Sequence, residues 1–346
     1  MPELPEVEAV RAGLARHLTG RRIADVEILD SRPLRRQDGG PEAFAQALRG
    51  RAITGAARRG KFLWLPLDDG RALSAHLGMS GQLLVRGTAA PAVAAASGAH
   101  LSPPGESPPD LTATRAPSLV RDLSCHPRHL RIRLLLAPLP GDAPGGVALD
   151  LVDQRMLGGM RVTELVPTAD GAPGGQGSPE PLVPADAAHI ARDLLDPALD
   201  RAAAVTRARS SRRAIKTVLL DQGIVSGIGN IYADEGLWHG GVHGSRQSAA
   251  LSRRAVERVL KATASVMERA LAVGGTSFDS LYVDVEGAPG YFARSLAVYG
   301  RAGRECRRCG ATLRSEVIGG RSHTSCPRCQ TRPRARGTRG QPGPRL

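Results

Sequence analysis

The chain has 346 residues, 41% of them apolar, and this length allows two domains with separate hydrophobic cores. It contains no apolar run of 18 residues and does not open with a basic stretch followed by an apolar one, so we expect neither a membrane-spanning helix nor a secretory signal, and a cytoplasmic protein. The formal net charge of +14 favours a polyanionic partner, with a merely solvated basic surface as the alternative.

The first ten residues, MPELPEVEAV, predict the start of a helix but are not fully explained by it. Pro5 suits the first helical turn, and acidic side chains there face the positive end of the helix dipole. Val10 and Leu14 continue with helical spacing. Pro2 and Glu3 lie before this helix, so the helix gives no reason for their presence.

The remainder of residues 1–165 is rich in predicted strands. Short apolar segments such as RIADVEIL, KFLWLPL and SGQLLV occur before residue 87, and HLRIRLLLAPL and GGVALDLVD occur after residue 128. Between them, residues 87–119 consist largely of Ala, Pro, Ser and Gly. This stretch has too few large apolar residues to form a core, so we expect a disordered surface insertion.

The second half of the chain is predicted to be helical up to a cysteine-rich module. Residues 166–184 are rich in Pro and Gly and are expected to be an interdomain linker. Helical patterns follow within residues 185–299, in ADAAHIARDLL, SRRAIKTVLLD, IYADEGLWHG and RRAVERVLKATASVMERALA. We expect the cysteine-rich module, a zinc finger, at residues 300–330 and a basic, disordered tail at residues 331–346.

Four cysteines have the spacing of a metal site. Two residues lie between Cys306 and Cys309, two lie between Cys326 and Cys329, and sixteen lie between the pairs. This pattern predicts tetrahedral ligation of one zinc ion, and four protein ligands leave no open position for water, so the zinc should be structural. Disulfides are the alternative and would require an oxidising compartment. Cys125 lies outside the pattern.

Three further features suit phosphate binding, each with an ordinary alternative. Residues 301–346 contain twelve Arg against two Glu, and Arg321 follows two glycines that predict a hairpin tip, where its side chain could bind phosphate or stay solvated. The glycine-rich segment before Asn230 could present backbone N–H groups to a phosphate or form a packing corner. Only Lys61, Lys216 and Lys261 are lysines among 47 cationic residues, which suggests positions that need a compact or titratable amine.

Seven features occur in a specific order: MPELPEVE, RRGKFLW, HLGMSGQLLV, DQRMLGG, IKTVLLDQGIVSGIGNIYADE, PGYFARSLAVYGR and the four-cysteine spacing. Together they resemble the formamidopyrimidine-DNA glycosylase family of bacterial base-excision repair enzymes. The resemblance covers nearly the whole chain apart from the insertion, the linker and the tail. It implies an α+β multidomain fold with an N-terminal β-sandwich and leading helix, a helix-two-turn-helix DNA-binding domain and a C-terminal four-cysteine zinc finger.

The resemblance also implies an activity. Members of the family are bifunctional DNA glycosylases and AP lyases that remove oxidised purines, such as 8-oxoguanine and formamidopyrimidines, and cleave the strand by β,δ-elimination. Pro2, exposed by removal of Met1, is the implied nucleophile, Glu3 the implied proton shuttle, and Lys61 and Arg321 the implied groups for β- and δ-elimination. An α-amino group titrates nearer neutrality than a lysine side chain, which agrees with this choice of nucleophile.

By the same resemblance, several residues should contact damaged double-stranded DNA, the expected partner of a monomeric enzyme at the bacterial nucleoid. Those inserted into the duplex beside the extruded nucleotide are Met79, Arg155 and Leu157, and those that contact phosphates are Arg212, Lys216 and Asn230. The family usually has Phe at the position of Leu157, so this chain lacks an aromatic stacker there. His126 and His129 are both candidates for a family histidine.

Two other functions compete with this one. The endonuclease VIII branch of the same fold prefers oxidised pyrimidines, but it typically opens with PEGPE, whereas this chain has PELPE. A non-catalytic zinc-containing DNA-binding protein is the second alternative. The presence of Pro2, Glu3 and Lys61 argues against it, and a DNA-nicking assay separates the two.

Overall fold

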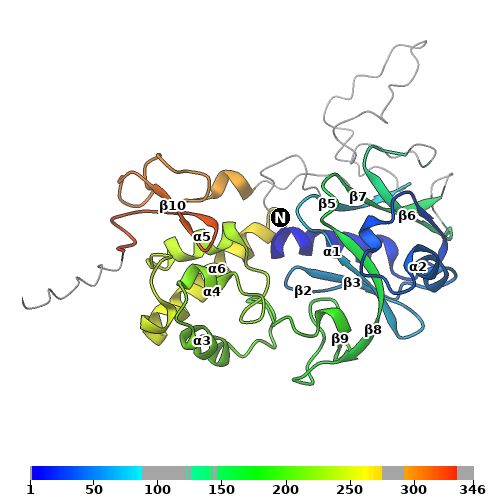
Figure 1. The fold of residues 1–346 in the computed structure, drawn as a ribbon, viewed down its shortest axis with the longest axis horizontal. Helices are drawn as coiled ribbons and strands as arrows, with labels where there is room; N and C mark the ends of the chain where they lie inside the picture. The colour runs from blue at the N-terminus through cyan, green and yellow to red at the C-terminus, as the bar shows by residue number, and fades with distance from the viewer. Residues whose placement is uncertain are drawn as a thin grey trace, which may run out of the picture.

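The computed structural model of the chain describes residues 2–87, 123, 126–140, 142, 146–274 and 292–332. A strand-rich part and a helical part lie side by side, and the N-terminus lies between them (Figure 1). Nearly all of the expected insertion, Cys125 and the tail beyond residue 332 fall outside the described residues. Among the helices described, none combines the length and apolar character needed to cross a membrane.

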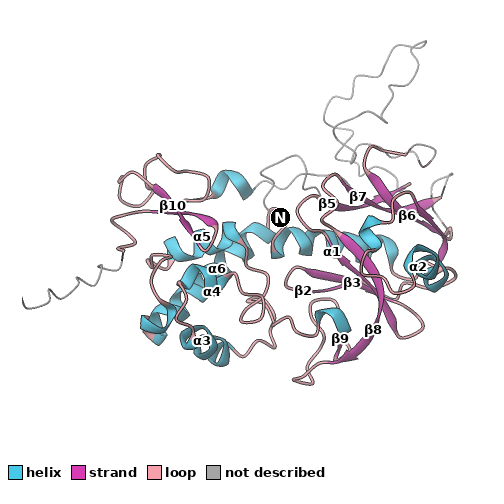
Figure 2. Ribbon diagram, viewed as in Figure 1, coloured by secondary structure: helices cyan, strands magenta, loops and turns pink. Residues whose placement is uncertain are grey.

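Two antiparallel sheets form the strand-rich part (Figure 2). One has the order β1-β6-β7-β5 and the other β2-β3-β4-β8-β9. Their inward-facing Val, Ile and Leu side chains share one core, as expected for a sandwich. The strands are β1 (Ile23–Ile28), β2 (Ala57–Arg59), β3 (Phe62–Pro66), β4 (Arg71–His76), β5 (Gly81–Arg86), β6 (Leu130–Leu136), β7 (Val147–Asp153), β8 (Gly159–Pro167) and β9 (Leu182–Pro184).

The leading helix α1 (Leu4–Leu18) packs into both parts of the molecule. Leu4 belongs to the core of the helical part, whereas Val7 and Leu14 belong to the core of the sandwich. The carboxylate of Glu6 accepts a hydrogen bond from the backbone N–H of Glu3 at 2.8 Å, which satisfies a donor at the start of the helix. The residues before α1 are thereby fixed at the junction of the two parts.

The helical part contains α3 (Arg201–Ser210), α4 (Ile215–Leu219), α5 (Asn230–His239) and α6 (Arg253–Leu271). The helical patterns expected around α4, α5 and α6 are confirmed. The hairpin of β10 (Arg314–Ile318) and β11 (Arg321–Ser325) packs on α5 and turns at Gly319-Gly320, as predicted. The sandwich, the helical part and this hairpin confirm the α+β fold that the resemblance implied.

Three local expectations differ from the structure. The two ends of the segment expected as a linker, residues 166–184, belong to the sheet, because β9 pairs with the end of β8. The expected helix at residues 185–195 is only a 3-10 turn, Ala185–Ala187, because Asp193 instead accepts tertiary hydrogen bonds from the Arg58 side chain and the Gly60 backbone N–H. The sequence analysis also did not predict α3 or the short helix α2 (Gly40–Leu48).

Candidate active site

The carboxylate of Glu3 lies at the N-terminus of helix α5. It accepts hydrogen bonds from the backbone N–H groups of Gly229 at 2.6 Å, Ile231 at 2.8 Å and Tyr232 at 3.3 Å. Gly229 permits this approach, since an added Cβ would lie 2.3 Å from the Glu3 Cδ atom. The glycine-rich segment therefore presents its N–H groups to a carboxylate of the protein itself, at the junction of the two parts.

Burial raises the pKa of Glu3 to about 7, an effect opposed by nearby Lys61 and reinforced by Glu6. Glu6 is itself held by the Tyr232 hydroxyl, which donates to it at 3.0 Å. A carboxyl group that titrates near neutrality can both give and take a proton at cellular pH. Glu3, directly beside Pro2, is thus suited to proton transfer.

Lys61 stands at the turn between β2 and β3 and reaches the same junction. Its Nζ atom donates to the backbone carbonyl oxygen of Ile228 at 2.8 Å, and burial lowers its pKa. The preceding Gly60 has a left-handed φ of 59°, and a Cβ there would lie 2.4 Å from the Ser226 hydroxyl oxygen. This turn can therefore approach the glycine-rich segment only with glycine at position 60.

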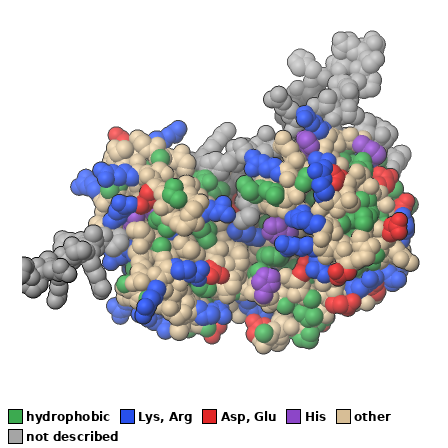
Figure 3. Space-filling model, viewed as in Figure 1, with side chains coloured by type: hydrophobic (Ala, Val, Ile, Leu, Met, Phe, Trp, Pro, Cys, Tyr) green, Lys and Arg blue, Asp and Glu red, His purple; other side chains and the backbone are tan. Residues whose placement is uncertain are grey.

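A cavity of about 540 Å³ joins these groups to the zinc-finger hairpin. Arg321, at the hairpin tip, is solvent-exposed and lines the cavity together with Glu3 and Lys61. Lys and Arg side chains are also spread over the face where the two parts meet (Figure 3). The structure thus brings three of the four expected catalytic residues to one cationic cavity, with the fourth, Pro2, adjacent in sequence to Glu3.

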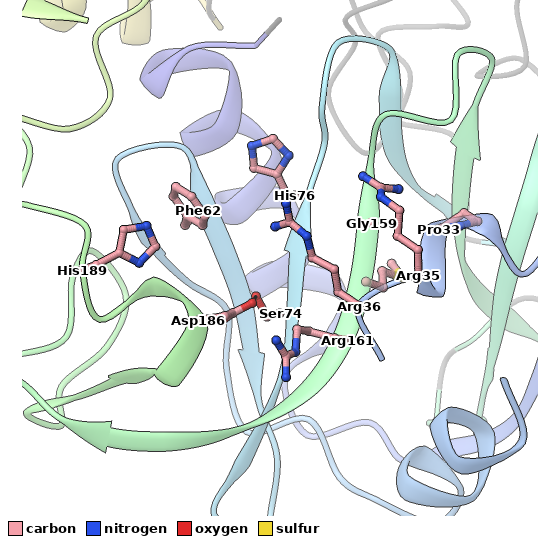
Figure 4. A pocket seen from close by; sticks show the side chains of 11 residues that line it. Pro33, Arg35, Arg36, Phe62, Ser74, His76, Gly159, Arg161, Asp186 and His189 are labelled. Carbon is pink, nitrogen blue, oxygen red and sulfur yellow. Dashed lines mark hydrogen bonds between the residues drawn. The ribbon is translucent and has the colours of Figure 1, made fainter. Parts of the chain in front are cut away.

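A smaller cavity, of about 130 Å³, adjoins the first and shares Phe62 and His76 with it. The Phe62 and His76 rings are 5.4 Å apart between centroids, and Arg35 and Arg36 extend beside them from another segment (Figure 4). Burial lowers the pKa of His76, and Lys61 and these two arginines lower it further. The surroundings of His76 therefore disfavour its charged form, in a wall that contains several cations.

Two of the three residues expected to enter the duplex are exposed apolar side chains. Met79 and Leu157 are 41% and 46% exposed, and Arg155 is also exposed. Their two loops lie against each other, since a Cβ at Gly78 would lie 2.5 Å from the carbonyl carbon of Leu157. Exposure of large apolar groups at adjoining loop tips suits insertion between bases.

Buried Asp153 holds these two loops together. Its Oδ1 atom accepts from the Ser80 hydroxyl at 2.6 Å and from the Arg155 backbone N–H at 3.1 Å, while Oδ2 accepts from the Gly158 N–H at 2.7 Å. From the other side, Arg35 donates to the carbonyl oxygen of Gly158 at 2.8 Å. The two loops that carry Met79 and Leu157, here called the wedge loops, are thus fixed through their backbone as well as by packing.

Replacement of Asp153 by Asn should loosen these loops, because one carboxylate oxygen that accepts N–H bonds becomes an amide donor. An unsatisfied buried hydrogen-bonding group costs about 1–3 kcal/mol, so excision from duplex DNA should fall by roughly tenfold. Cleavage of an abasic site in single-stranded DNA, which needs no extrusion, should change far less. Single-turnover rates on the two substrates test this, with the exposed Asp38→Asn variant as control; equal losses on both would contradict a wedge role.

The residues expected to contact phosphates differ in their accessibility. Arg212 is exposed, and Asn230 donates from its amide nitrogen to the Ser322 hydroxyl at 3.1 Å at the edge of the cavity. Lys216 is instead fully buried, with its ammonium 2.7 Å from a carboxylate oxygen of Asp234. In this structure the Lys216 ammonium is held in the protein interior, whereas Arg212 is exposed and Asn230 is half-buried.

Neither candidate histidine is singled out by the structure. His126 is exposed and lies 3.6 Å from a carboxylate oxygen of Glu27. His129 has a left-handed φ of 69°, and its carbonyl oxygen accepts a hydrogen bond from the N–H of Asp153 at 3.0 Å. His129 therefore supports the strand that carries Asp153, and a DNA contact by either histidine stays a prediction.

The four cysteines expected to bind zinc converge. Their sulfur atoms all lie within 4.8 Å of one another. Burial and the neighbouring cysteine side chains raise the pKa of Cys329 to about 12, because a second thiolate is disfavoured beside one that is already ionised. Four sulfur ligands at this separation fit one tetrahedral Zn²⁺, which confirms the expected structural site and leaves no position for substrate.

Sequence reasoning missed several residues that shape the cavity. Tyr299 lines it, and its backbone N–H donates to Glu235 at 2.9 Å, as do the N–H groups of two preceding residues. Phe62 and His76 lie within segments quoted for the resemblance, but no role followed from their positions. Glu235 could have been noticed as one of two adjacent carboxylates within a helix whose other buried residues are mostly apolar.

Three regions of the chain match described families. Residues 1–160 match the formamidopyrimidine-DNA glycosylase N-terminal domain, residues 190–281 the H2TH domain of that enzyme, and residues 303–332 a zinc finger found in FPG and IleRS. These matches follow the order of the sandwich, the helical part and the hairpin.

Relatives and solved structures give the same similarity over nearly the full length. The formamidopyrimidine-DNA glycosylase of Mycolicibacterium smegmatis is 48% identical over 96% of this chain and 99% of its own, and that of Leifsonia xyli is 46% identical over 95% and 99%. A Lactococcus lactis FPG mutant in complex with Fapy-dG containing DNA superposes with a TM-score of 0.70 at 25% identity, covering 96% of this chain and 100% of that one. The L. lactis Fpg in complex with an abasic site containing DNA superposes with a TM-score of 0.69 at 25% identity, covering 95% of this chain and 100% of that one.

Proposed function

The chain belongs to the formamidopyrimidine-DNA glycosylase family, and we propose from its geometry how its residues carry out that family's reaction. It is a DNA glycosylase of base-excision repair, and AP lyase activity is typical of the family. The observation that carries the mechanism is the Glu3 carboxylate at the N-terminus of α5, beside a cavity lined by Lys61 and Arg321. Oxidised purines in double-stranded DNA are the substrates, by analogy with the L. lactis protein and its Fapy-dG containing DNA.

Pro2 is the nucleophile in this mechanism. Removal of Met1 converts its nitrogen from an amide to a secondary amine, which attacks the sugar C1′ as the bond to the damaged base breaks. The adjacent Glu3 transfers protons during attack and ring opening. The product is an iminium ion that joins Pro2 to C1′ and makes the C2′ protons acidic.

Strand cleavage then proceeds by two eliminations. Loss of a C2′ proton breaks the C3′–O bond and releases the phosphate on the 3′ side, and loss of the C4′ proton breaks the C5′–O bond and releases the phosphate on the 5′ side. Lys61 serves the first step as general acid or phosphate contact, and Arg321 stabilises the phosphate that leaves in the second. Both line the same cavity.

The protein's other groups hold the DNA and open the duplex. Met79, Arg155 and Leu157 fill the space left by the extruded nucleotide, whose extrusion costs a few kcal/mol. Arg212 and Asn230 contact phosphates. Zinc, when bound by the four cysteines, fixes the loops that carry the β10–β11 hairpin.

Excision kinetics on matched duplexes test the substrate assignment. The duplexes carry 8-oxoguanine, a formamidopyrimidine or an oxidised pyrimidine, and we expect kcat/KM to be highest for the purine lesions. Preference for the pyrimidine would support the endonuclease VIII alternative, and purified protein that nicks none of them would support the non-catalytic alternative. We further propose that the enzyme is a monomer in the bacterial cytoplasm, where its DNA substrate lies; light scattering checks the oligomeric state.

Replacement of Glu3 by Gln should lower the rate of base removal by about 10²–10⁴-fold. The rate of cleavage of a ready-made abasic site should fall less. The reason is that the proton transferred by Glu3 is needed mainly while the base leaves. Single-turnover rates on the two substrates measure the difference, with the exposed Glu42→Gln variant as control. Equal effects on both substrates would mean that Glu3 acts mainly through structure.

The pH dependence of base removal provides a second check on Glu3. Its pKa is raised to about 7, so the protonated, donating form decreases as pH rises through that value. A protonated Pro2 amine would lower the Glu3 pKa by charge attraction, so the alkaline decline should have its midpoint at or below pH 7. A base-removal rate that stays constant from pH 6 to 9 would contradict proton donation by Glu3.

A further inference from the structure

Three ionisable side chains form a buried cluster that the proposed chemistry does not use. Lys216 on α4, Asp234 on α5 and His323 on β11 have side-chain exposures of 0%, 1% and 0%. Charged groups are rarely buried so fully, because removal from water is costly unless each group has close partners. A buried cluster of this kind suggests that α4, α5 and β11 must be held in one fixed arrangement.

The carboxylate of Asp234 is the centre of the cluster. Its Oδ1 atom accepts from Lys216 Nζ at 2.7 Å and lies 2.6 Å from His323 Nδ1, and its Oδ2 accepts from the Thr324 backbone N–H at 2.9 Å. Lys216 also donates to the carbonyl oxygen of Ser322. The other ring nitrogen of His323 accepts from the backbone N–H of Gly244 at 3.2 Å, which fixes the orientation of the ring. The cluster therefore holds three consecutive residues of β11, 322 to 324.

The residue just before this anchored run is Arg321. The hairpin tip is seated on α4, since a Cβ at Gly319 would lie 2.8 Å from the Thr217 hydroxyl oxygen. Asn230, at the start of α5, donates to the Ser322 side chain. The backbone of Arg321 is thus fixed on both sides, while its own side chain is exposed at the cavity.

We propose that Asp234 is a positioning residue for Arg321, acting through Lys216, His323 and the Thr324 backbone to hold the guanidinium where the second phosphate leaves. This inference rests on the proposed role of Arg321 in δ-elimination. Asp234 and its partners do not touch the reacting atoms. They position the Arg321 guanidinium, which does.

The step concerned is the loss of the C4′ proton with cleavage of the C5′–O bond, whose electron pair stays on the departing phosphate oxygen. A guanidinium stabilises that charge only if it lies within hydrogen-bonding distance of the phosphate. Misplacement of such a group by about 1 Å can cost as much as 10²-fold in rate. β-Elimination, which the proposal assigns to Lys61 on the β2–β3 turn, does not depend on the hairpin in this way.

The test measures the partition between the two eliminations on a 5′-labelled duplex with a single abasic site. β-Elimination alone leaves a 3′-unsaturated aldehyde, whereas both eliminations leave a 3′-phosphate, and the two products separate on a denaturing gel. In Asp234→Asn we expect the rate of δ-elimination relative to β-elimination to fall by at least about tenfold. Asp68→Asn, which removes a carboxylate from the Arg22–Asp68 pair in the β3–β4 turn, is the matched control.

Two further variants separate the possible causes. Arg321→Ala should accumulate the aldehyde product; if it does not, the proposed role of Arg321 fails, and this inference fails with it. If Arg321→Ala shifts the partition and folded, zinc-loaded Asp234→Asn does not, only the positioning role is overturned. Should Asp234→Asn fail to fold, the double variant Lys216→Met/Asp234→Asn, which leaves no unpaired ammonium, is expected to show the same shift, and an unchanged partition there overturns the inference.

The single variant Lys216→Met distinguishes positioning from a phosphate contact. Loss of one phosphate contact should reduce the salt dependence of DNA binding by about one in log–log slope. We expect that slope to stay unchanged and the product partition to shift towards the aldehyde. A reduced slope with an unchanged partition would show that Lys216 acts on DNA directly and would overturn its part in positioning Arg321.

Discussion

Blocking the Pro2 nitrogen should abolish both base removal and strand cleavage, with a loss of at least about a thousandfold, as for other enzymes that lose their nucleophile. An N-terminal tag or a retained Met1 makes this nitrogen an amide, which cannot form an iminium. Borohydride should trap the wild-type intermediate as a stable adduct between protein and damaged DNA. Peptide mapping should place that adduct at residue 2.

The control is the same tagged protein after a protease has cut immediately before Pro2. Trapping and activity should return together, which excludes damage to the fold by the tag. Lys61 is the alternative nucleophile, because burial lowers its pKa and a desolvated lysine can be a nucleophile. An adduct at Lys61 or Lys216, or efficient lyase activity with the N-terminus blocked, would contradict the assignment.

Removal of zinc should lower DNA affinity by at least about 100-fold at physiological salt, the loss expected when several phosphate contacts disappear together. The binding energy of a structural zinc is largely the folding energy of its module, so the hairpin that carries Arg321 should unfold. The sandwich has its own core and should remain folded. Fluorescence anisotropy with an abasic-site duplex, before and after chelation, measures the affinity.

The two tryptophans of the chain report on the two regions separately. Trp64 is buried on strand β3 of the sandwich, whereas Trp238 packs with Cys306 and has the Arg308 guanidinium 4.1 Å from its ring centroid. After chelation, emission should shift to longer wavelength in a Trp64→Phe variant and stay constant in a Trp238→Phe variant. Unchanged DNA affinity after complete zinc removal would contradict the prediction, and a shift in both variants would show that the sandwich also depends on zinc.

The sequence predicted features whose cause is local. The two Cys-x2-Cys pairs define a zinc site because two ligands on one tight turn are already close. Gly319-Gly320 predicted the hairpin tip, since both residues adopt left-handed φ angles of 56° and 74°. The apolar spacing of α6 predicted a long helix with one buried face, and the order of motifs along the chain identified the family.

Interactions between distant segments decided the rest. The helical pattern at residues 185–195 predicted the wrong structure because Asp193 forms a buried ion pair with Arg58, 135 residues earlier in the chain. Short α2 was missed because nine residues carry too few repeats of the helical period to stand out. At residues 185–195 tertiary contacts outweighed the local pattern, whereas at α2 the local pattern was too short to recognise.

Sequence alone therefore determined the family, the zinc ligands and the residues suited to chemistry at the N-terminus, because these depend on residue type and short spacing. Only the tertiary structure showed that the Glu3 carboxylate binds the N-terminus of α5, and that Lys216 is buried against Asp234 rather than exposed to DNA. Exposure and pKa depend on what surrounds a side chain, and the partner of Lys216 is 18 residues away while one partner of Glu3 is 229 residues away. The spacing of residues along the chain does not show which distant residues become neighbours in the folded protein.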